Sequence, residues 1–268
     1  MQRQIATIKL YVVLGALLIA ASLAPLSFAQ SQSQPTTISN LYLVRVTRVK
    51  LETAREYSAF TQNETTPALK KGGVKLRNTL TSTIFGEAGE YIFVEPVESL
   101  KRFDEPESLR KALGDEDYRA WLAKWARLVA SSHAYIVQLR PDLSANMPKP
   151  DAPPAKFAMG VRITVAPGRQ AEYESYVKND VLPILQKAYP KGVLTSKVLL
   201  GGNGNEYRVL ALTDSFADLE NGMLVATREG FARIQPKTAG IVLHTENSVL
   251  RYVPELSIRP EAQKAENK

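Results

Sequence analysis

Apolar and polar positions between residues 41 and 143 follow a pattern that predicts four strands and two helices. Short runs of apolar and β-branched residues predict strands at Leu41–Val49, Val74–Phe85, Glu90–Glu95 and Ala134–Leu139. Apolar residues three and four positions apart predict helices at Thr53–Lys71 and Asp115–Ser131. Gly72 and Gly73 end the first helix, and the turn at residues 86–89 joins the two middle strands. The predicted order of elements is therefore β-α-β-β-α-β.

The same order is predicted again between residues 156 and 258. Its strands are Phe157–Val165, Leu194–Leu200, Tyr207–Thr213 and Val249–Val253, and its helices are Gln170–Ala188 and Gly222–Ile234. The second of these helices is interrupted before Pro236. The glycine-rich segment Gly201–Asn205 joins two strands and opens no helix, so it is interpreted as a hairpin loop rather than a phosphate-binding loop.

The two segments also match residue by residue when one is shifted by 116 positions. The shared residues include Val49 with Val165, Tyr57 with Tyr173, Asn63 with Asn179, Pro67 with Pro183 and Tyr91 with Tyr207. After a further shift of three positions, Pro141-Asp142-Leu143-Ser144 aligns with Pro254-Glu255-Leu256-Ser257. An ungapped match of this length predicts an internal duplication.

A β-α-β-β-α-β unit is the ferredoxin-like arrangement, whose sheet has helices on one face and needs a second layer on the other. We therefore expect an α+β fold in which two tandem ferredoxin-like (βαββαβ) units form an intrachain dimeric α+β barrel. In this arrangement the two sheets supply the missing layer to each other, and the helices lie outside. Pro67 and Pro183 lie inside the predicted first helices, where each removes a backbone hydrogen bond and is expected to kink or break the helix.

The unit order, the unit size, the duplication and the first-helix sequences resemble the dimeric α+β barrel superfamily. The helix sequences are EYSAFTQNETTPALKK at residues 56–71 and EYESYVKNDVLPILQK at residues 172–187. The NIPSNAP-like and antibiotic-biosynthesis-monooxygenase-like branches are the most similar. The resemblance implies a ligand pocket between a unit's sheet and its helices. The superfamily includes small monooxygenases, haem-degrading enzymes and haem peroxidases, so the fold does not decide the function.

The first 29 residues have the layout of a secretory signal peptide. Arg3 and Lys9 precede the apolar run Leu10–Ala24, and Ser27-Phe28-Ala29 forms a cleavage site. The run is shorter than the roughly 20 residues of a membrane-spanning helix, although a retained anchor is the alternative. We expect a periplasmic or secreted protein that is cleaved after Ala29. The remaining segments are interpreted as a flexible leader (30–39), a first unit (40–143), a Pro-rich linker (144–155), a second unit (156–258) and a disordered tail (259–268).

Charge and cysteine content narrow the chemistry. Without the signal segment, which holds two basic residues and no acid, the formal net charge falls from +7 to +5. The charges are mixed along the chain, so no nucleic-acid binding is predicted. The chain has no cysteine, which excludes thiol catalysis, thiolate metal sites and haem attached through cysteine. No metal site and no stable membrane span after cleavage are predicted. A small molecule is the expected partner, with a homo-oligomer also open.

Each predicted first helix carries an acid within an apolar face. In the first helix this face comprises Tyr57, Phe60, Thr61, Glu64 and Ala68, and in the second it comprises Tyr173, Tyr176, Val177, Asp180 and Ile184. Burial would raise the pKa of Glu64 or Asp180 and make it a candidate proton carrier. The alternatives are a structural ion pair, for example with Arg45 or Arg162, and a face whose edge is exposed to solvent.

Two histidines and two tryptophans complete the candidate residues. His133 is a third catalytic candidate, but neither it nor His244 has a partner at metal-binding spacing. We therefore predict no cofactor, although a single histidine could ligate a haem iron. Trp121 and Trp125 share a helix face and either pack in the core or stack on a flat ligand. The candidate ligand-binding residues are Tyr57, Phe60, Trp121, Trp125, Tyr173 and Tyr176.

Three hypotheses about function remain open, and whether the protein is an enzyme is undecided. The first is an exported protein that binds a small, partly apolar ligand between sheet and helices. The second is a cofactor-independent monooxygenase-like or haem-handling enzyme that uses the same pocket, with Glu64, Asp180 or His133 handling protons. The third is a purely structural or interaction module. A solid interior filled by side chains would favour the third hypothesis.

Overall fold

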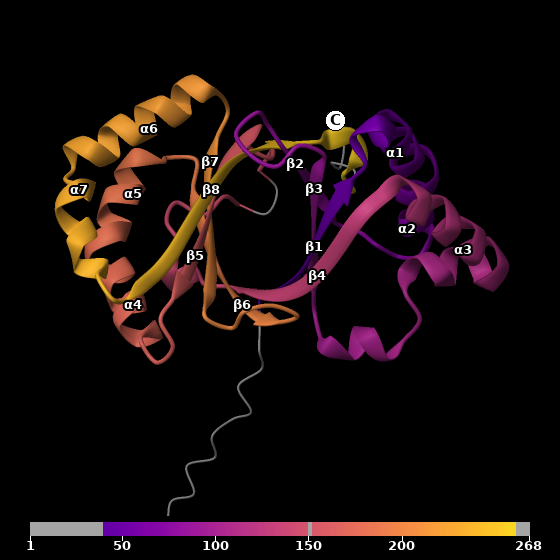
Figure 1. Cartoon of the computed structure of the whole chain (residues 1–268), viewed down its shortest axis with the longest axis horizontal. Helices are drawn as coiled ribbons and strands as arrows, with labels where there is room; N and C mark the ends of the chain where they lie inside the picture. Colours follow the sequence, from indigo (N-terminus) through magenta and orange to yellow (C-terminus); the bar gives the residue numbers. More distant parts are fainter. Residues whose placement is uncertain (1–39, 150–151, 261–268) are drawn as a thin grey trace, which may run out of the picture. The chain divides into compact units, whose positions relative to one another are not determined.

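The computed structural model describes residues 40–149 and 152–260, in which eight strands form a barrel with helices outside it (Figure 1). The N-terminal half (residues 40–143) contains β1 (Leu41–Val49), β2 (Asn78–Ser82), β3 (Glu90–Val97) and β4 (Val129–Leu139). The C-terminal half (residues 156–258) contains β5 (Phe157–Val165), β6 (Val193–Leu200), β7 (Glu206–Thr213) and β8 (Val242–Tyr252). The strand order around the closed barrel is β1-β3-β2-β8-β5-β7-β6-β4, and all neighbours are antiparallel.

The predicted fold class of two tandem ferredoxin-like units is wrong. Neither half has a sheet of its own, because both outer strands of each half pair with strands of the other half. Leu80 of β2 pairs with Tyr252 of β8, and Val137 of β4 pairs with Val198 of β6. An isolated four-stranded sheet would leave two edges of unpaired backbone groups, and closure into one antiparallel barrel removes those edges.

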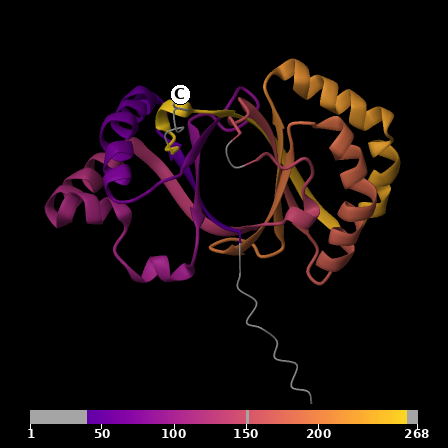
Figure 2. The same cartoon turned by 180° about the vertical axis from the view of Figure 1, so that it is seen from behind.

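The helices lie in two groups on opposite sides of the barrel (Figures 1 and 2). The N-terminal group is α1 (Ala54–Phe60), α2 (Thr66–Lys71) and α3 (Ser108–Leu128), and the C-terminal group is α4 (Gln170–Tyr176), α5 (Leu182–Ala188), α6 (Phe216–Arg228) and α7 (Phe231–Ile234). Single turns of 3₁₀-helix lie at η1 (Leu51–Thr53), η3 (Leu100–Asp104), η4 (Pro141–Leu143), η6 (Gln235–Thr238) and η7 (Pro254–Leu256). No helix within residues 40–149 and 152–260 is long and apolar enough to cross a bilayer.

Each predicted first helix contains a π-helical turn instead of a break. The turns are η2 (Thr61–Thr65) between α1 and α2, and η5 (Val177–Val181) between α4 and α5, at the same offset of 116. The backbone N–H of Thr66 bonds to the carbonyl of Thr61, five residues back. Pro67 follows directly and has no N–H to continue the α-helical pattern. The extra residue in the turn rotates everything after it around the helix axis by about 100°.

The two halves are tied together by the aligned segments Pro141–Ser144 and Pro254–Ser257. Each segment follows the last strand of one half and packs on the other half. Leu143 and Leu256 have no exposed surface. The Ser144 hydroxyl accepts a hydrogen bond from the Thr195 amide at 2.9 Å, and the Ser257 hydroxyl accepts one from the Thr79 amide at 2.9 Å. This reciprocal exchange gives the repeated sequence a structural role in joining the halves.

Several element boundaries differ from those predicted. The strands β1 and β5 have the predicted bounds. The helix α3 begins at Ser108 and β4 begins at Val129, whereas a helix to Ser131 and a strand from Ala134 were expected. Pairing with β1 along nearly its whole length extends β4 into residues whose local pattern favours helix. Residues 1–39, including the predicted signal peptide and leader, lie outside the described residues, as do residues 261–268 of the predicted tail.

Candidate functional site

The two acids on the first helices do not lie in the buried face predicted for them. Glu64 is exposed, with 47% of its side-chain surface accessible, and forms an ion pair with Lys124 of α3 at 3.0 Å. Thr65, one residue later, is buried in its place. Asp180 is similarly displaced by Val181 and is 25% exposed. The π-helical turn explains both shifts. In a regular α-helix the residue seven positions after the buried tyrosine would share its face, but the extra residue in the turn moves that place to the eighth position.

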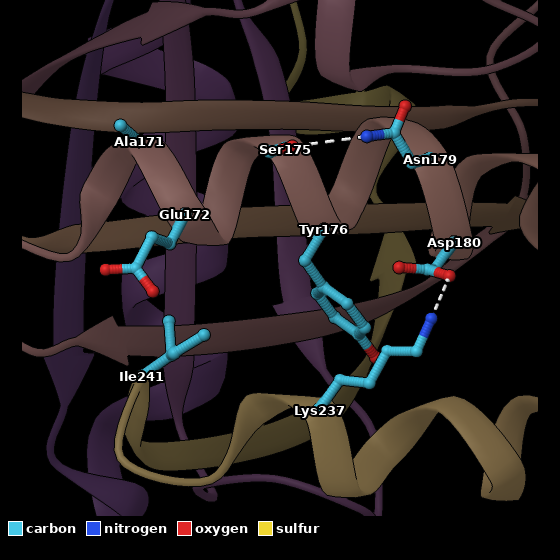
Figure 3. A pocket seen from close by; sticks show the side chains of 8 residues that line it. All are labelled: Ala171, Glu172, Ser175, Tyr176, Asn179, Asp180, Lys237 and Ile241. Atoms are coloured by element: carbon cyan, nitrogen blue, oxygen red, sulfur yellow. Dashed lines mark hydrogen bonds and ion pairs between the residues drawn. The ribbon is translucent and has the colours of Figure 1, made fainter.

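Asp180 lies in an open groove on the C-terminal half (Figure 3). Residues of α4, η5, η6 and the turn before β8 line it: Ala171, Glu172, Ser175, Tyr176, Asn179, Asp180, Lys237 and Ile241. The Lys237 Nζ lies 2.6 Å from Asp180 Oδ1, and the Asn179 amide donates to Ser175 Oγ at 3.1 Å. Glu172 is paired with Arg169 outside the groove. The polar groups lining this groove are therefore largely satisfied by one another.

In the N-terminal half the corresponding position is closed by aromatic side chains. Tyr176 of the groove is equivalent to Phe60, and Phe60 is covered by Trp121 at a ring-centroid distance of 5.8 Å. We call the rings packed between sheet and helices the aromatic layer. One group of contacting rings is Tyr57, Tyr91 and Phe93, and a second is Phe60, Tyr118, Trp121 and Trp125; members of both groups pack in one hydrophobic cluster. Trp121 Nε1 donates to Thr65 Oγ1 at 3.0 Å, so the residue that replaces Glu64 helps to orient the indole. Four of the predicted ligand-binding residues thus meet in one layer.

Tyr57 anchors the aromatic layer to the sheet. Its ring lies 5.1 Å from that of Tyr91 on β3, and burial raises the pKa of its hydroxyl to about 12. The hydroxyl lies beside Thr61 and Thr47, and Thr47 Oγ1 is 3.2 Å from Ser132 Oγ. The phenol therefore stays protonated near neutral pH and can donate a hydrogen bond within the layer.

The equivalent tyrosines of the C-terminal half, Tyr173 and Tyr207, belong to a paired polar network. Their rings lie 4.7 Å apart, and the Tyr207 hydroxyl donates to Glu174 Oε1 at 2.7 Å. Arg140 binds both carboxylate oxygens of Glu174, at 2.6 and 2.8 Å, and also binds Asp142. These hydrogen bonds from Arg140 hold the pKa values of Glu174 and Asp142 below their usual ranges. The predicted residue Tyr173 therefore lies in a structural network, while Tyr176 lines the groove.

Arg77 is a residue of the N-terminal layer that sequence reasoning did not single out. Its side chain is 7% exposed, and its guanidinium lies 3.9 Å from the centre of the Phe93 ring. Its Nε is buried without a hydrogen-bond partner, and Glu95 Oε1 is 3.8 Å from that nitrogen. Burial lowers the pKa of this guanidinium. One feature of the sequence could have indicated its burial: at the repeat offset of 116, Arg77 aligns with the apolar residue Val193.

His133 faces the barrel interior, away from the layer between sheet and helices. It alternates along β4 with Ser132, which faces the helices, and its ring lies 5.8 Å from that of Tyr135. Tyr135 is packed beneath the guanidinium of Arg208 from β7, at 4.8 Å. The side chain of His133 therefore points away from the aromatic layer. The structure does not bring Glu64, Asp180 and His133 into one site.

The inner surface of the barrel, which His133 faces, carries charged side chains from the C-terminal half. Its ion pairs include Arg162 with Glu246 and Arg208 with Glu206, and His244 Nε2 lies 2.8 Å from Glu246 Oε1. Because His133 and His244 both face the interior, neither described histidine can serve as an axial ligand in the layer between sheet and helices. This layer does not fit a haem held by histidine.

Comparisons with known proteins bear on the fold. No protein family model and no curated protein sequence match the chain. The structure is similar to that of a candidate monooxygenase from Lactobacillus acidophilus NCFM, with a TM-score of 0.52 at 9% identity over 79% of this chain and 93% of that one. A candidate monooxygenase from Fusobacterium nucleatum subsp. nucleatum gives a TM-score of 0.51 at 15% identity over 79% and 91%. A chlorite dismutase mutant from Candidatus Nitrospira defluvii gives a TM-score of 0.49 at 9% identity over 81% and 92%.

At these identities the similarities concern the fold alone. The two monooxygenase alignments support only the fold-level part of the resemblance inferred from the sequence, namely an α+β barrel fold shared with these two structures. The pairing of outer strands between the halves excludes two separate ferredoxin-like sheets but is compatible with this shared barrel fold. None of these comparisons supports the NIPSNAP-like branch in particular.

Proposed function

We propose that the protein binds a small, partly apolar molecule between the sheet and the helices of its N-terminal half. The observation that carries this proposal is the incomplete packing of α3 over the aromatic layer. Its buried residues are Leu109, Ala112 and Leu128, so the long middle of the helix has none. Trp121 and Trp125 lie in that middle and remain half-buried. Large aromatic faces under a weakly held helix are suited to stacking on a ligand.

Entry of a ligand requires α3 to move, and the helix has a point at which it can bend. Gly114 interrupts it with φ 78° and ψ 173°, a left-handed conformation that side-chain-bearing residues rarely adopt. Segments with few buried contacts open at low free-energy cost. We therefore place the moving part at residues 115–128, which carry Tyr118 and both tryptophans.

The groove of the C-terminal half is a weaker candidate. Its volume of about 480 Å³ would hold a small molecule, but it is open to solvent along its length. Its polar side chains are paired with one another, as Asp180 is with Lys237, so they offer little to orient a ligand.

Binding can be measured with N-phenyl-1-naphthylamine, a neutral apolar fluorophore. Both tryptophans of the chain lie in α3, so energy transfer from tryptophan to bound probe reports on the layer. Trp125→Ala should reduce probe binding several-fold, whereas the control Tyr176→Ala in the groove should not. Binding that depends on Tyr176 instead would move the site to the groove. A protein that binds no apolar probe would favour the purely structural module.

A second candidate function is monooxygenation of the bound molecule. The fold similarity to two candidate monooxygenases favours it. In this proposal Glu64, Asp180 or His133 would handle protons, but their positions in three different environments weigh against a shared role. Oxygen consumption by the protein together with each ligand that binds would test this activity.

We also propose that the protein acts outside the cytoplasm. The layout of residues 1–29 supports export, with a mature chain that begins at Gln30. N-terminal sequencing of the protein from its native envelope or medium would test this. A chain that retains Leu10–Ala24 would instead support a membrane anchor.

A further inference from the structure

Arg77 is enclosed where the sheet meets the helices of the N-terminal half. It precedes β2, and its backbone forms an antiparallel bridge with Ile258, which directly follows the segment Pro254–Ser257. Its guanidinium packs against Phe93, a member of the aromatic layer, and lies close to the neutral Tyr57 hydroxyl. A positive group thus lies at the inner wall of the same layer that holds Trp121.

The protein provides poor compensation for this charge. The Nε has no hydrogen-bond partner, and Glu95 approaches it only to 3.8 Å. Glu95 is itself bonded to Arg102 Nη2 at 2.8 Å. Burying a charge without good hydrogen bonds is costly, and nearly all buried polar groups in folded proteins have partners. An enclosed guanidinium with an unused donor therefore calls for an acceptor that the chain does not supply.

The surrounding charges are also unbalanced. Arg45 of β1 pairs with Phe93 of β3, whose ring packs against Arg77, and the charge of Arg45 further lowers the pKa of the Arg77 guanidinium. Two guanidinium groups, those of Arg77 and Arg102, thus share the carboxylate of Glu95, and Arg102 makes the shorter contact with it. Residual positive charge in a partly dry layer attracts an anion more strongly than the same charge would in water.

The other half shows that the fold does not need a charge at this position. Val193 occupies the equivalent position and is fully buried, and Ala211 takes the place of Glu95. The buried arginine and its carboxylate are therefore particular to the N-terminal half, like the two tryptophans.

We propose that Arg77 binds the carboxylate of a small aromatic or aliphatic monocarboxylic acid whose apolar part stacks in the aromatic layer. This inference rests on the proposed function and specifies its ligand class. A guanidinium and a carboxylate match in geometry through paired N–H···O bonds. The neutral Tyr57 hydroxyl is a second donor on the same side. The nearby Glu95 carboxylate disfavours ligands with a second negative charge, which is why a monoanion is specified.

The test compares phenylacetate and octanoate with their neutral amides, using tryptophan fluorescence of the full chain. The unmodified protein should bind each carboxylate at least about tenfold more tightly than its amide, the preference expected for one charged hydrogen bond. Arg77→Met should abolish that preference, and Arg77→Lys should retain part of it. Equal binding of acid and amide, or a preference that survives Arg77→Met, would overturn the inference.

A second variant covers the case in which Arg77→Met does not fold. Glu95→Gln removes the competing carboxylate and should tighten phenylacetate binding several-fold without affecting phenylacetamide. A variant that weakens or does not change phenylacetate binding would count against Arg77 as the anion site. If N-phenyl-1-naphthylamine binds through Trp125 while no carboxylate is preferred, the anion inference fails and the proposed function stands. If neither the neutral probe nor any acid or amide binds, the proposed function fails as well.

Discussion

The N-terminal and C-terminal halves place equivalent elements around one barrel but fill the layer between sheet and helices with different chemistry. Both contain a pair of tyrosines whose rings contact each other at a tilt, Tyr57 with Tyr91 and Tyr173 with Tyr207. In the C-terminal half Tyr207 donates a hydrogen bond to Glu174, which is also bound through both carboxylate oxygens by Arg140. In the N-terminal half the tyrosines meet tryptophans and an arginine without a good partner. A satisfied network favours a structural role, and an unsatisfied one favours a ligand site.

The largest expected effect is a loss of stability when the segments that join the two halves are altered. Leu143→Ala and Leu256→Ala should each lower the free energy of unfolding by ~2–5 kcal/mol, because each removes a fully buried side chain from a tie between the halves. Urea unfolding would measure both losses. A large loss for one leucine and none for the other would show that the two ties are not equivalent.

The next largest effect is a difference in stability between variants of the two arginine sites. Arg140→Met should cost about 1–3 kcal/mol, because it breaks several charge-assisted hydrogen bonds in the C-terminal network. Arg77→Met should be neutral or stabilising without ligand, because a poorly paired buried charge is replaced by an apolar side chain of similar length. Urea unfolding of the two variants side by side tests this contrast. A large loss of stability for Arg77→Met would mark Arg77 as structural.

Acid should weaken the C-terminal network selectively. Glu174 and Asp142 have pKa values lowered by hydrogen bonds from Arg140, so both carboxylates bind protons more readily in the unfolded chain. Their stabilisation is present above the unfolded pKa values and is lost as the pH falls below about 4.5 and through the lowered folded values. Stability measured against pH should show this decline in the unmodified protein and a weaker one in Arg140→Met. If stability fell equally with pH in the unmodified protein and in Arg140→Met, the stabilisation would not come from the hydrogen bonds of Arg140.

The smallest effects are expected at the two displaced acids. Glu64→Gln and Asp180→Asn each remove one ion pair with substantial exposure, so each should change the free energy of unfolding by less than ~1 kcal/mol. Neither should alter binding of the neutral probe. Unchanged stability and binding in both variants would reject a central role for these acids, whereas a loss of binding in Glu64→Gln alone would extend the N-terminal site to the helix surface.

Local pattern predicted much of the secondary structure but not how the strands close. The bounds of β1 and β5 follow from apolar and β-branched runs. The closure between β2 and β8 depends on pairing between residues far apart in the chain, such as Leu80 and Tyr252, which no local signal records. The alignment of the Leu143 and Leu256 segments indicated a duplication, but it did not predict that each segment packs on the other half.

The candidate site was predicted in part. Tyr57, Phe60, Trp121 and Trp125 do meet in one layer, because the first two precede the π-helical turn and the last two lie in the regular part of α3, so α-helical spacing holds for both pairs. Glu64 was placed on the wrong side, because one extra residue in the turn puts Thr65 where Glu64 was expected. Arg77 was missed because a charged residue in a predicted strand is usually exposed, and only the three-dimensional packing against Phe93 reveals its burial.

A crystal structure of the protein soaked with phenylacetate tests the central claim most directly. We predict phenylacetate between α3 and the sheet of the N-terminal half, with its ring against Trp121 and its carboxylate on Arg77, while the network of Arg140 is unchanged. Phenylacetate bound in the groove beside Tyr176 and Lys237 instead, or an aromatic layer that stays closed at saturating ligand, would contradict the account.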